Sequence, residues 1–305
     1  DEVKKINPEI IMCSISFAGQ EGPLANEPGF DYMAAAYAGI TEMIGENDRS
    51  PSQVSMAVGD SATGISAAMA VVVALLHRER TGEGQFIDCS LLDTYLQMHE
   101  DYIPRVGLRG DAASPGRSGS QHPNGGPTGI FECGDGSFLQ MMIMPYQWPR
   151  LLQAIGMPEL EKDTRFNSPQ NRRKNKYELQ GIIEQWMAKI GDRQDILTIL
   201  KNQRVPVAPV LTLQEAINHP HAIQRGAIRQ IKDPFIGNFP IPGQPPIFSK
   251  WSHNNELRAP LLGEHNEEIL TTICGLDKSE IVALHENGII NTDPTFLESP
   301  SDPLK

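Results

Sequence analysis

Short apolar runs alternate with longer segments of helical spacing over residues 1–105, and this alternation constrains the fold more than any other feature of the sequence. Two runs, residues 10–16 and 86–90, have the continuous apolar and β-branched character of buried strands. Helical spacing occurs in three segments, residues 30–45, 61–80 and 91–103. Strands that alternate with helices in this way form parallel sheets with the helices as crossovers. We therefore predict a parallel α/β large domain.

The chain changes character after residue 105. Residues 106–129 are crowded with Gly, Pro and Ser and show no apolar period, which predicts a linker and a long, functional loop. Two apolar segments around Gly134-Asp135-Gly136 predict a hairpin. Helical spacing follows at residues 147–155, 174–188, 192–202 and 213–219. We predict a smaller α+β domain over residues 130–236, and a return to the large domain and a C-terminal tail over residues 237–305.

The composition excludes several classes of function. The chain has 305 residues, of which 39% are hydrophobic, so it can bury a substantial core. A formal net charge of -12 argues against binding to nucleic acid, because phosphate backbones need clustered Lys and Arg. The longest apolar run, residues 67–76, is shorter than the roughly 20 residues that span a bilayer, so we expect no membrane contact.

The four cysteines, Cys13, Cys89, Cys133 and Cys274, are far apart in the sequence and form no C-x-x-C pair. This spacing predicts neither a zinc site nor a disulfide framework. The histidines show no H-E-x-x-H or comparable ligand spacing. We expect buried, reduced thiols in a cytoplasmic protein that has no metal site.

One acid stands out among the candidate functional residues. Asp60 lies at the predicted start of the apolar helix that follows it. An Asp at the N-cap accepts hydrogen bonds from the first turn, and the helix dipole stabilises its negative charge. Such a carboxylate can serve as a plain helix cap, an electrostatic anchor or a nucleophile. The spacing alone leaves these three roles open.

Other reactive patterns are weaker. The segment "GRSGS" at residues 116–120 does not match G-x-S-x-G, and "RTGEGQ" at residues 80–85 lacks the Lys-Ser/Thr ending of a phosphate-binding loop. His122 differs from the other histidines because it lies in the Gly-rich loop, where its side chain could reach a ligand.

Five segments together resemble a known family. They are "PGFDYMAAAYAGI", the stretch from "GDSATG" at residue 59 to "CSLLD" at residue 93, "HPNGGPTGIFECGDG", "RVPVAPV" and "RAPLLGEHNEEIL". Their order and spacing are similar to those of the class III (CaiB/BaiF-type) CoA-transferases, a family that also contains carnitine CoA-transferase, formyl-CoA transferase and α-methylacyl-CoA racemase. The resemblance covers most of the chain, up to about residue 290.

The resemblance implies an activity and a set of site residues. It implies that Asp60 attacks the thioester of an acyl-CoA, giving an enzyme-bound anhydride, and that a carboxylic acid is the acceptor. Backbone N–H groups near the helix start would hold the oxyanion. Asp31, Tyr32 and Leu91 match positions that border the active site or CoA in relatives. The active-site loop would comprise Gly119, His122, Asn124, Gly125 and Gly126. We expect no tightly bound cofactor, with a CoA thioester as substrate, and an interlocked homodimer.

An α-methylacyl-CoA racemase is the first alternative. That branch carries a His as one of the two bases around the substrate α-carbon, and Phe30 stands at the matching position here. A Glu of the same branch falls near Met144 and Pro145. Moving a proton at the α-carbon needs positioned acid and base groups, so their absence favours the transferase.

The second alternative is a non-catalytic module. Relatives begin with a further N-terminal segment that completes the Rossmann-like layer and supplies most contacts to CoA. We therefore expect a large domain that is incomplete at its N-terminus. The missing strands could be supplied by a longer gene product or by a separate chain. Alternatively, the chain could be a truncated family member that only dimerises or binds a partner.

Overall fold

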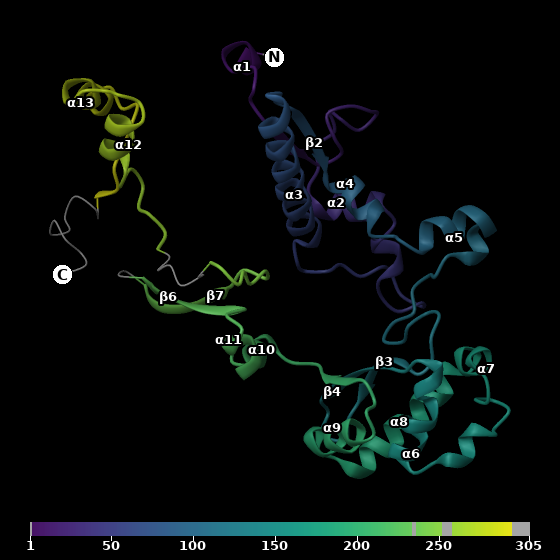
Figure 1. The fold of residues 1–305 in the computed structure, drawn as a ribbon. Coiled ribbons are helices and arrows are strands. Elements are labelled where there is room, and N and C mark those ends of the chain that lie inside the picture. The colour runs from purple at the N-terminus through teal and green to yellow at the C-terminus, as the bar shows by residue number, and fades with distance from the viewer. Residues whose placement is uncertain (1, 234–235, 252–257, 295–305) are drawn as a thin grey trace. The chain divides into compact units, whose positions relative to one another are not determined.

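The computed structural model describes residues 2–233, 236–251 and 258–294. The chain divides into two compact units, Asp1–Val210 and Leu211–Lys305, each of which is described by itself (Figure 1). The predicted domain boundaries and the return of the chain to the large domain stay predictions. Residues 252–257 and 295–305 of the predicted C-terminal segment lie outside the described residues.

The first part of unit 1 contains the parallel pair that the sequence predicts. Strand β1 (Met12–Ser16) pairs in parallel with β2 (Phe86–Ser90). The crossover between them contains α2 (Asp31–Tyr37), the 3-10 turn η1 (Thr41–Met43) and α3 (Val58–Thr81). A short helix, α1 (Glu2–Ile6), precedes β1. Helix α3 contacts both strands, α2 and α4 (Leu91–Gln97).

Two of the predicted helices are shorter than the sequence suggests. The segment 30–45 is helical only to Tyr37, followed by η1. The segment 91–103 divides into α4 and α5 (Tyr102–Arg109). The break between α4 and α5 has two physical causes. The buried His99 Nε2 bonds the Ala38 carbonyl oxygen at 2.7 Å. Pro104, which has no N–H, is tolerated in a new first turn but not in a helix interior.

Residues 104–129 are also more ordered than a long loop. Helix α5 extends into this stretch, and a 3-10 turn, η2 (Asp111–Ala113), follows it. The predicted linker therefore begins with regular structure.

The second part of unit 1 is a small α+β layer with a large apolar core. Strands β3 (Thr128–Glu132), β4 (Phe138–Met142) and β5 (Val207–Pro209) form an antiparallel sheet, which confirms the predicted hairpin. Helices pack against the sheet or against one another, as Figure 1 shows: α6 (Trp148–Ile155), α8 (Lys176–Ile190) and α9 (Arg193–Asn202). The short elements η3 (Pro145–Gln147), η4 (Pro158–Glu161) and α7 (Pro169–Lys174) complete the layer. Nineteen buried side chains form its core.

Unit 2 consists of short elements. A two-stranded antiparallel sheet joins β6 (Ile228–Asp233) and β7 (Gly237–Pro242). Two short helices precede it, α10 (Leu213–Ile217) and α11 (Pro220–Gln224). Two helices follow, α12 (Asn266–Thr272) and α13 (Lys278–Glu286). The sequence predicted the first helix and extended chain after residue 237, but it did not predict the strand β6.

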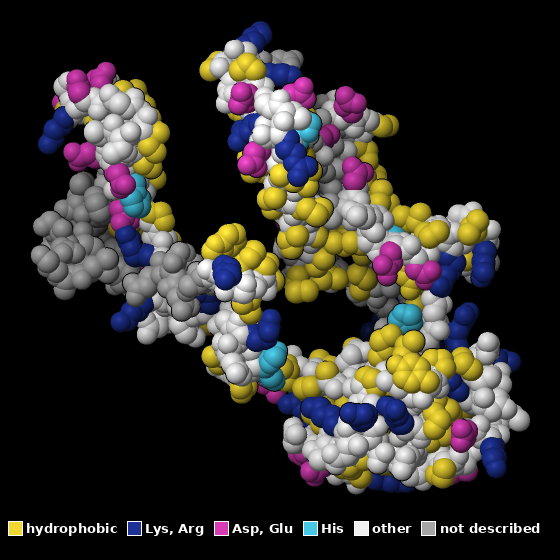
Figure 2. All heavy atoms as spheres, viewed as in Figure 1, with side chains coloured by type: hydrophobic (Ala, Val, Ile, Leu, Met, Phe, Trp, Pro, Cys, Tyr) yellow, Lys and Arg dark blue, Asp and Glu magenta, His cyan; other side chains and the backbone are white. Residues whose placement is uncertain are grey.

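Helix α3 leaves much of its apolar surface uncovered. Its exposed apolar side chains include Ile65, Met69, Val72 and Val73, each more than 60% exposed. Figure 2 shows hydrophobic side chains along this helix. By length and composition α3 is the one described helix that could cross a membrane, and 22% of its most apolar window is buried. A single such helix is weak evidence, since core helices of soluble proteins pass the same test.

Candidate functional site

Asp60 lies in the first turn of α3, with an exposed side chain. The predicted N-cap position is wrong, because the helix begins at Val58 and Ala57 is the N-cap. The capping groups come from other elements, which lets the helix start earlier than its own residues suggest. Asp60 still gains from the positive end of the helix dipole. Among the described residues, its carboxylate has no hydrogen-bond or ion-pair partner.

A buried pair of side chains fixes the backbone at Asp60. The Asp60 N–H donates to Asp31 Oδ2 at 3.0 Å, and the Gly59 N–H donates to the Tyr95 hydroxyl oxygen at 3.0 Å. The Tyr95 hydroxyl in turn donates to Asp31 Oδ1. Asp31 and Tyr95 are 5% and 4% exposed. The Asp31 carboxylate, the Tyr95 hydroxyl and the two backbone N–H groups form a continuous hydrogen-bond network that sets the position of the first turn of α3.

Burial and the hydrogen bond to Asp31 raise the pKa of Tyr95 to about 12, so its phenol stays neutral and can donate at physiological pH. Gly59 is required by this arrangement. A Cβ at that position would lie 2.3 Å from the Tyr95 ring, closer than any real contact. The glycine therefore allows the phenol to reach the helix backbone.

The first turn of α3 has no free N–H group for an oxyanion. The Val58 and Ser61 N–H groups donate to the carbonyl oxygens of Met56 and Ala57, at 2.9 and 3.1 Å. Those of Gly59 and Asp60 are taken by the network described above. The expectation that these backbone groups hold the oxyanion is not supported, because every donor already has an acceptor.

An apolar pocket of about 330 Å³ adjoins this network. Tyr32, Val58 and Tyr95 line it, together with Met56 and Met98. Tyr32, predicted to border the site, therefore lines a cavity next to the start of α3. Leu91 is buried in the core cluster that contains Tyr95, where it supports that ring.

The loop from Gly119 to Gly126 is fastened at its first end. The Gly119 N–H donates to the Gly45 carbonyl oxygen at 3.0 Å, and the φ of Gly119 is +57°. A Cβ there would lie 2.2 Å from the Glu46 carboxylate. Arg117 forms an ion pair with Glu42. The start of the loop is thus attached to the segment that follows η1.

The loop then runs beside β3. Gln121 forms an isolated bridge with Gly129, and the His122 N–H donates to the Thr128 carbonyl oxygen at 2.8 Å. The Asn124 N–H donates to His122 Nδ1 at 3.2 Å. Pro123 to Gly125, the middle of the loop, are half-buried and form no backbone hydrogen bond with β3.

His122 keeps an exposed face but lies among cations. Partial desolvation and the charges of Lys176 and Arg105 lower its pKa below the usual value. At neutral pH the imidazole is therefore neutral, with Nδ1 acting as an acceptor. This electrostatic setting was not evident from the sequence.

A buried arginine fastens the second end of the loop. Arg172 is 4% exposed, and its guanidinium lies 4.6 Å from the centre of the Trp148 ring. Its Nε donates to the Gly126 carbonyl oxygen at 3.3 Å, and its NH1 donates to the Phe166 carbonyl oxygen at 2.8 Å. Arg172 holds Gly126 against the core of the small layer.

The structure groups the predicted residues into two sets. Asp31, Tyr32 and Asp60 lie around the start of α3, whereas Gly119, His122, Asn124, Gly125 and Gly126 belong to the loop. No hydrogen bond or ion pair joins Asp60 to the loop within the described ranges. Sequence reasoning missed Tyr95 and Arg172. Tyr95 lies one helical turn after Leu91, which was its only signal, and Arg172 is part of a charged run that is typical of a surface.

The four cysteines differ in burial. Cys133 is buried, Cys13 and Cys89 are half-buried, and Cys274 is exposed, so the expectation of four buried thiols is wrong. Burial and a hydrogen bond with Cys13 raise the pKa of Cys89. Over residues 2–233, 236–251 and 258–294, no group of three or more His, Cys, Asp or Glu side chains could hold a metal ion.

Comparisons with known proteins agree on one family. The sequence model described as CoA-transferase family III matches residues 1–266. The chain is 32% identical to succinyl-CoA–D-citramalate CoA-transferase of Chloroflexus aurantiacus, over 95% of this chain and 72% of that protein. It is 31% identical to succinate–glutarate CoA-transferase of Agrobacterium fabrum, over 92% of this chain and 69% of that protein.

The fold is similar to that of solved structures. A CAIB/BAIF family protein from Brucella suis superposes with a TM-score of 0.75 at 31% identity, covering 92% of this chain and 70% of that chain. Rv3272 from Mycobacterium tuberculosis has a TM-score of 0.74 at 23% identity, covering 88% of this chain and 70% of that chain, which shows the fold alone. The mixed α/β architecture predicted from the sequence is confirmed.

Proposed function

The chain belongs to CoA-transferase family III, and on that premise we propose that it moves CoA between an acyl-CoA and a carboxylic acid through a covalent intermediate on Asp60. The observation that carries this proposal is the exposure of the Asp60 carboxylate and its lack of a partner among the described residues. Asp31 and Tyr95 fix the backbone at Asp60. A carboxylate held in this way is a suitable nucleophile.

The proposed reaction needs no redox or metal chemistry. An Asp60 carboxylate oxygen attacks the thioester carbon, the C–S bond breaks, and CoA leaves as a thiolate, which gives an aspartyl anhydride. The thiolate then attacks the Asp60 carbonyl carbon, releasing the first acid and leaving a CoA thioester on Asp60. The second acid attacks this thioester to form a new anhydride and thiolate. Attack of the thiolate on the new acyl carbon gives the second acyl-CoA and restores Asp60.

Three features support roles for the chain's own residues. Asp31 and Tyr95 are positioning residues, because they bond the backbone of the Asp60 turn and not its carboxylate. The apolar pocket lined by Tyr32 is suited to an acyl chain. The loop from Gly119 to Gly126 would cover the intermediates. Its two fastened ends restrict movement to the segment around Asn124.

We propose a dicarboxylic acid as substrate. The relatives named above act on succinyl-CoA or succinate with citramalate or glutarate, each of which carries two carboxyl groups. We also propose that the chain works as an interlocked homodimer in the cytoplasm. The uncovered apolar face of α3 supports an interface there, since large exposed apolar surfaces mark interaction sites.

Intact-mass spectrometry tests the proposed intermediate. The chain is incubated with a panel of acyl-CoAs and then with hydroxylamine, which should convert an anhydride or thioester on Asp60 to a hydroxamate. Peptide mapping should place the added mass on Asp60. The D60N variant should lose both the adduct and turnover, whereas D93N, which changes an exposed acid in the first turn of α4, should keep both.

Two outcomes would contradict the proposal. Full turnover by D60N would exclude Asp60 as the nucleophile. Uptake of solvent deuterium at the substrate α-carbon, without CoA transfer, would favour the racemase. If no acyl-CoA binds or reacts, the non-catalytic module becomes the better explanation.

A further inference from the structure

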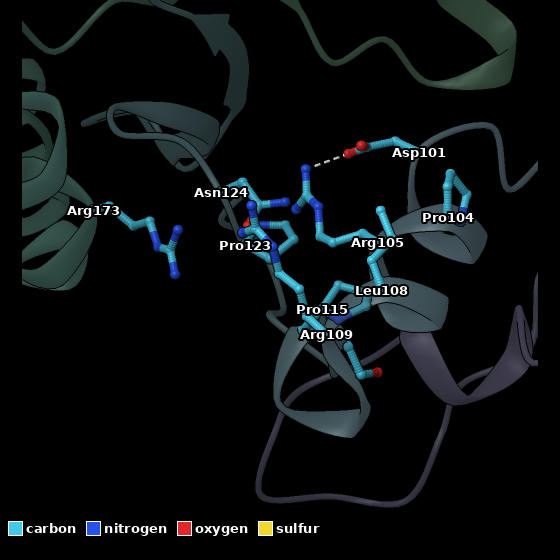
Figure 3. Close-up of a pocket in the computed structure, with 11 residues that line it drawn as sticks. Asp101, Pro104, Arg105, Leu108, Arg109, Pro115, Pro123, Asn124 and Arg173 are labelled. Atoms are coloured by element: carbon cyan, nitrogen blue, oxygen red, sulfur yellow. Dashed lines mark hydrogen bonds and ion pairs between the residues drawn. The ribbon is translucent and has the colours of Figure 1, made fainter.

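A second, larger pocket lies in unit 1, away from the apolar cavity beside Tyr95. Its volume is about 700 Å³, and it is bounded by α5, the segment after η2 and the middle of the loop at Pro123 and Asn124. Figure 3 shows Arg105 and Arg109 extending from α5 toward Asn124, with Arg173 of α7 approaching from the other side of the loop.

Cations are in excess around the pocket. Three guanidinium groups, those of Arg105, Arg109 and Arg173, line it, and Asp101 is the only acid among the lining residues. Asp101 forms an ion pair with Arg105. The guanidinium groups of Arg109 and Arg173 form no hydrogen bond or ion pair with the part of the chain that the structure describes. This concentration of positive charge occurs in a chain whose net charge is -12.

Neighbouring groups respond to this positive field. The charges of Lys176 and Arg105 contribute to the low pKa of His122. Burial and the charge of Arg173 lower the pKa of Lys176. Arg173 also lines an adjoining pocket of about 640 Å³ together with Lys174 and Asn124. The positive region therefore extends along both sides of the loop.

The geometry of these side chains suits an oxyanion. A guanidinium presents paired N–H donors that match the two oxygens of a carboxylate or phosphate. Unpaired cations that face one another repel, and a bound anion removes this repulsion. The Asn124 side chain adds a neutral hydrogen-bonding group at the pocket wall.

We propose that this pocket binds the oxyanion group, a carboxylate or a phosphate, of a small and multiply charged ligand. Assigning that ligand as the acid substrate or as the phosphates of CoA rests on the proposed function. Anion binding itself does not. Because Asn124 lies in the middle of the loop, a ligand held here would also restrict the movement of that segment.

Titration calorimetry on the full chain at low ionic strength tests the proposal. Succinate and inorganic pyrophosphate are the probes, and uncharged succinamide is the negative control. At least one of the two anions should bind, and added salt should weaken the binding. The double variant R109Q/R173Q should weaken it roughly tenfold or more, since hydrogen bonds to charged groups are the strong ones. R150Q, which removes an exposed arginine outside the pocket, should bind as the unmodified chain does.

The outcomes separate the ligand sources from one another and from the proposed function. Tighter binding of succinate assigns the pocket to the acid substrate, and tighter binding of pyrophosphate assigns it to the CoA phosphates. Equal binding by the double variant, with its fold verified by circular dichroism, would overturn the proposal, as would no binding of either anion. Adduct formation on Asp60 is measured in a separate experiment. A negative result for anion binding therefore does not contradict the proposed function, and a missing adduct does not contradict anion binding.

Discussion

The two layers of unit 1 are stabilised in different ways. The small α+β layer buries nineteen side chains in one apolar cluster, whereas the cluster beside α3 contains five. Around α3, buried polar side chains supply hydrogen bonds in place of a large apolar cluster. Those side chains are Asp31, Tyr95, Ser90 and His99. The proposed nucleophile therefore lies on a scaffold held by a few directed bonds, whereas the second end of the loop is fastened to a scaffold held by apolar packing.

This difference predicts different responses to mutation. Removing apolar volume should lower the free energy of unfolding most in the small layer. Removing a single polar atom should lower it most beside α3.

The largest effect is expected for L151A. Leu151 is fully buried in α6, so the change leaves a cavity and should lower the free energy of unfolding by about 2–5 kcal/mol. Urea unfolding followed by tryptophan fluorescence measures this. V72A is the matched control, because Val72 of α3 is 64% exposed and its truncation should have little effect. Similar costs for both variants would refute the contrast between the layers.

Alkaline pH should destabilise the α3 layer through Tyr95. Its folded pKa of about 12 lies above the ordinary value of 10, so the folded state holds the proton more tightly. The resulting stability is full below pH 10 and is lost as the pH rises toward 12. The loss amounts to roughly 2–3 kcal/mol at most. Urea midpoints measured across this range should fall more steeply for the unmodified chain than for Y95F. Parallel curves of urea midpoint against pH for the two proteins would contradict the raised pKa of Tyr95.

Y95F tests the network at neutral pH. The change removes one oxygen and leaves the Gly59 N–H and one oxygen of Asp31 without partners, which should cost about 1–3 kcal/mol. Turnover should fall through kcat more than through KM, because the Asp60 turn loses its support. Y37F serves as the control, since Tyr37 is exposed and its ring contact with Phe17 is retained. A Y95F enzyme with normal kcat would remove Tyr95 as a positioning residue.

The smallest effect concerns His122. Arg105 contributes to the low pKa of this histidine, so R105Q should move the pKa upward toward the ordinary value of 6.5. The imidazole then gains its charge at a higher pH than in the unmodified chain. An NMR titration of the His122 ring protons measures the shift, and R150Q should leave it unchanged. No shift in R105Q would weaken the evidence for a positive field at the loop.

Much of the fold could be predicted because its signals are local. The runs at Met12–Ser16 and Phe86–Ser90 carry their strand character in consecutive residues, and Gly134-Asp135-Gly136 predicts its hairpin by itself. Strand β6 was missed because the adjacent segment is rich in Pro, which hides its partner β7.

The site was less predictable, because its contacts join distant residues. Its residue type and the family resemblance identified Asp60 as a candidate. Its position inside the first turn of α3 was not predicted. The cap comes from Asp31, which lies 29 residues earlier, and from Tyr95 on another helix. The side chains that line the basic pocket likewise come from α5, the loop and α7, and no local pattern links them.

The stacking of Arg172 on Trp148 gives the protein an internal optical reporter. The Trp148 indole Nε1 is buried and has no hydrogen-bond acceptor among the described residues, and the guanidinium over its face is the same group that holds Gly126. Displacement of Gly126 removes one of the two hydrogen bonds that hold this cation over the ring, and a shift of the cation changes the field that the excited indole experiences. Loop movement should therefore be visible in the emission of an unlabelled protein, on the timescale of a stopped-flow experiment.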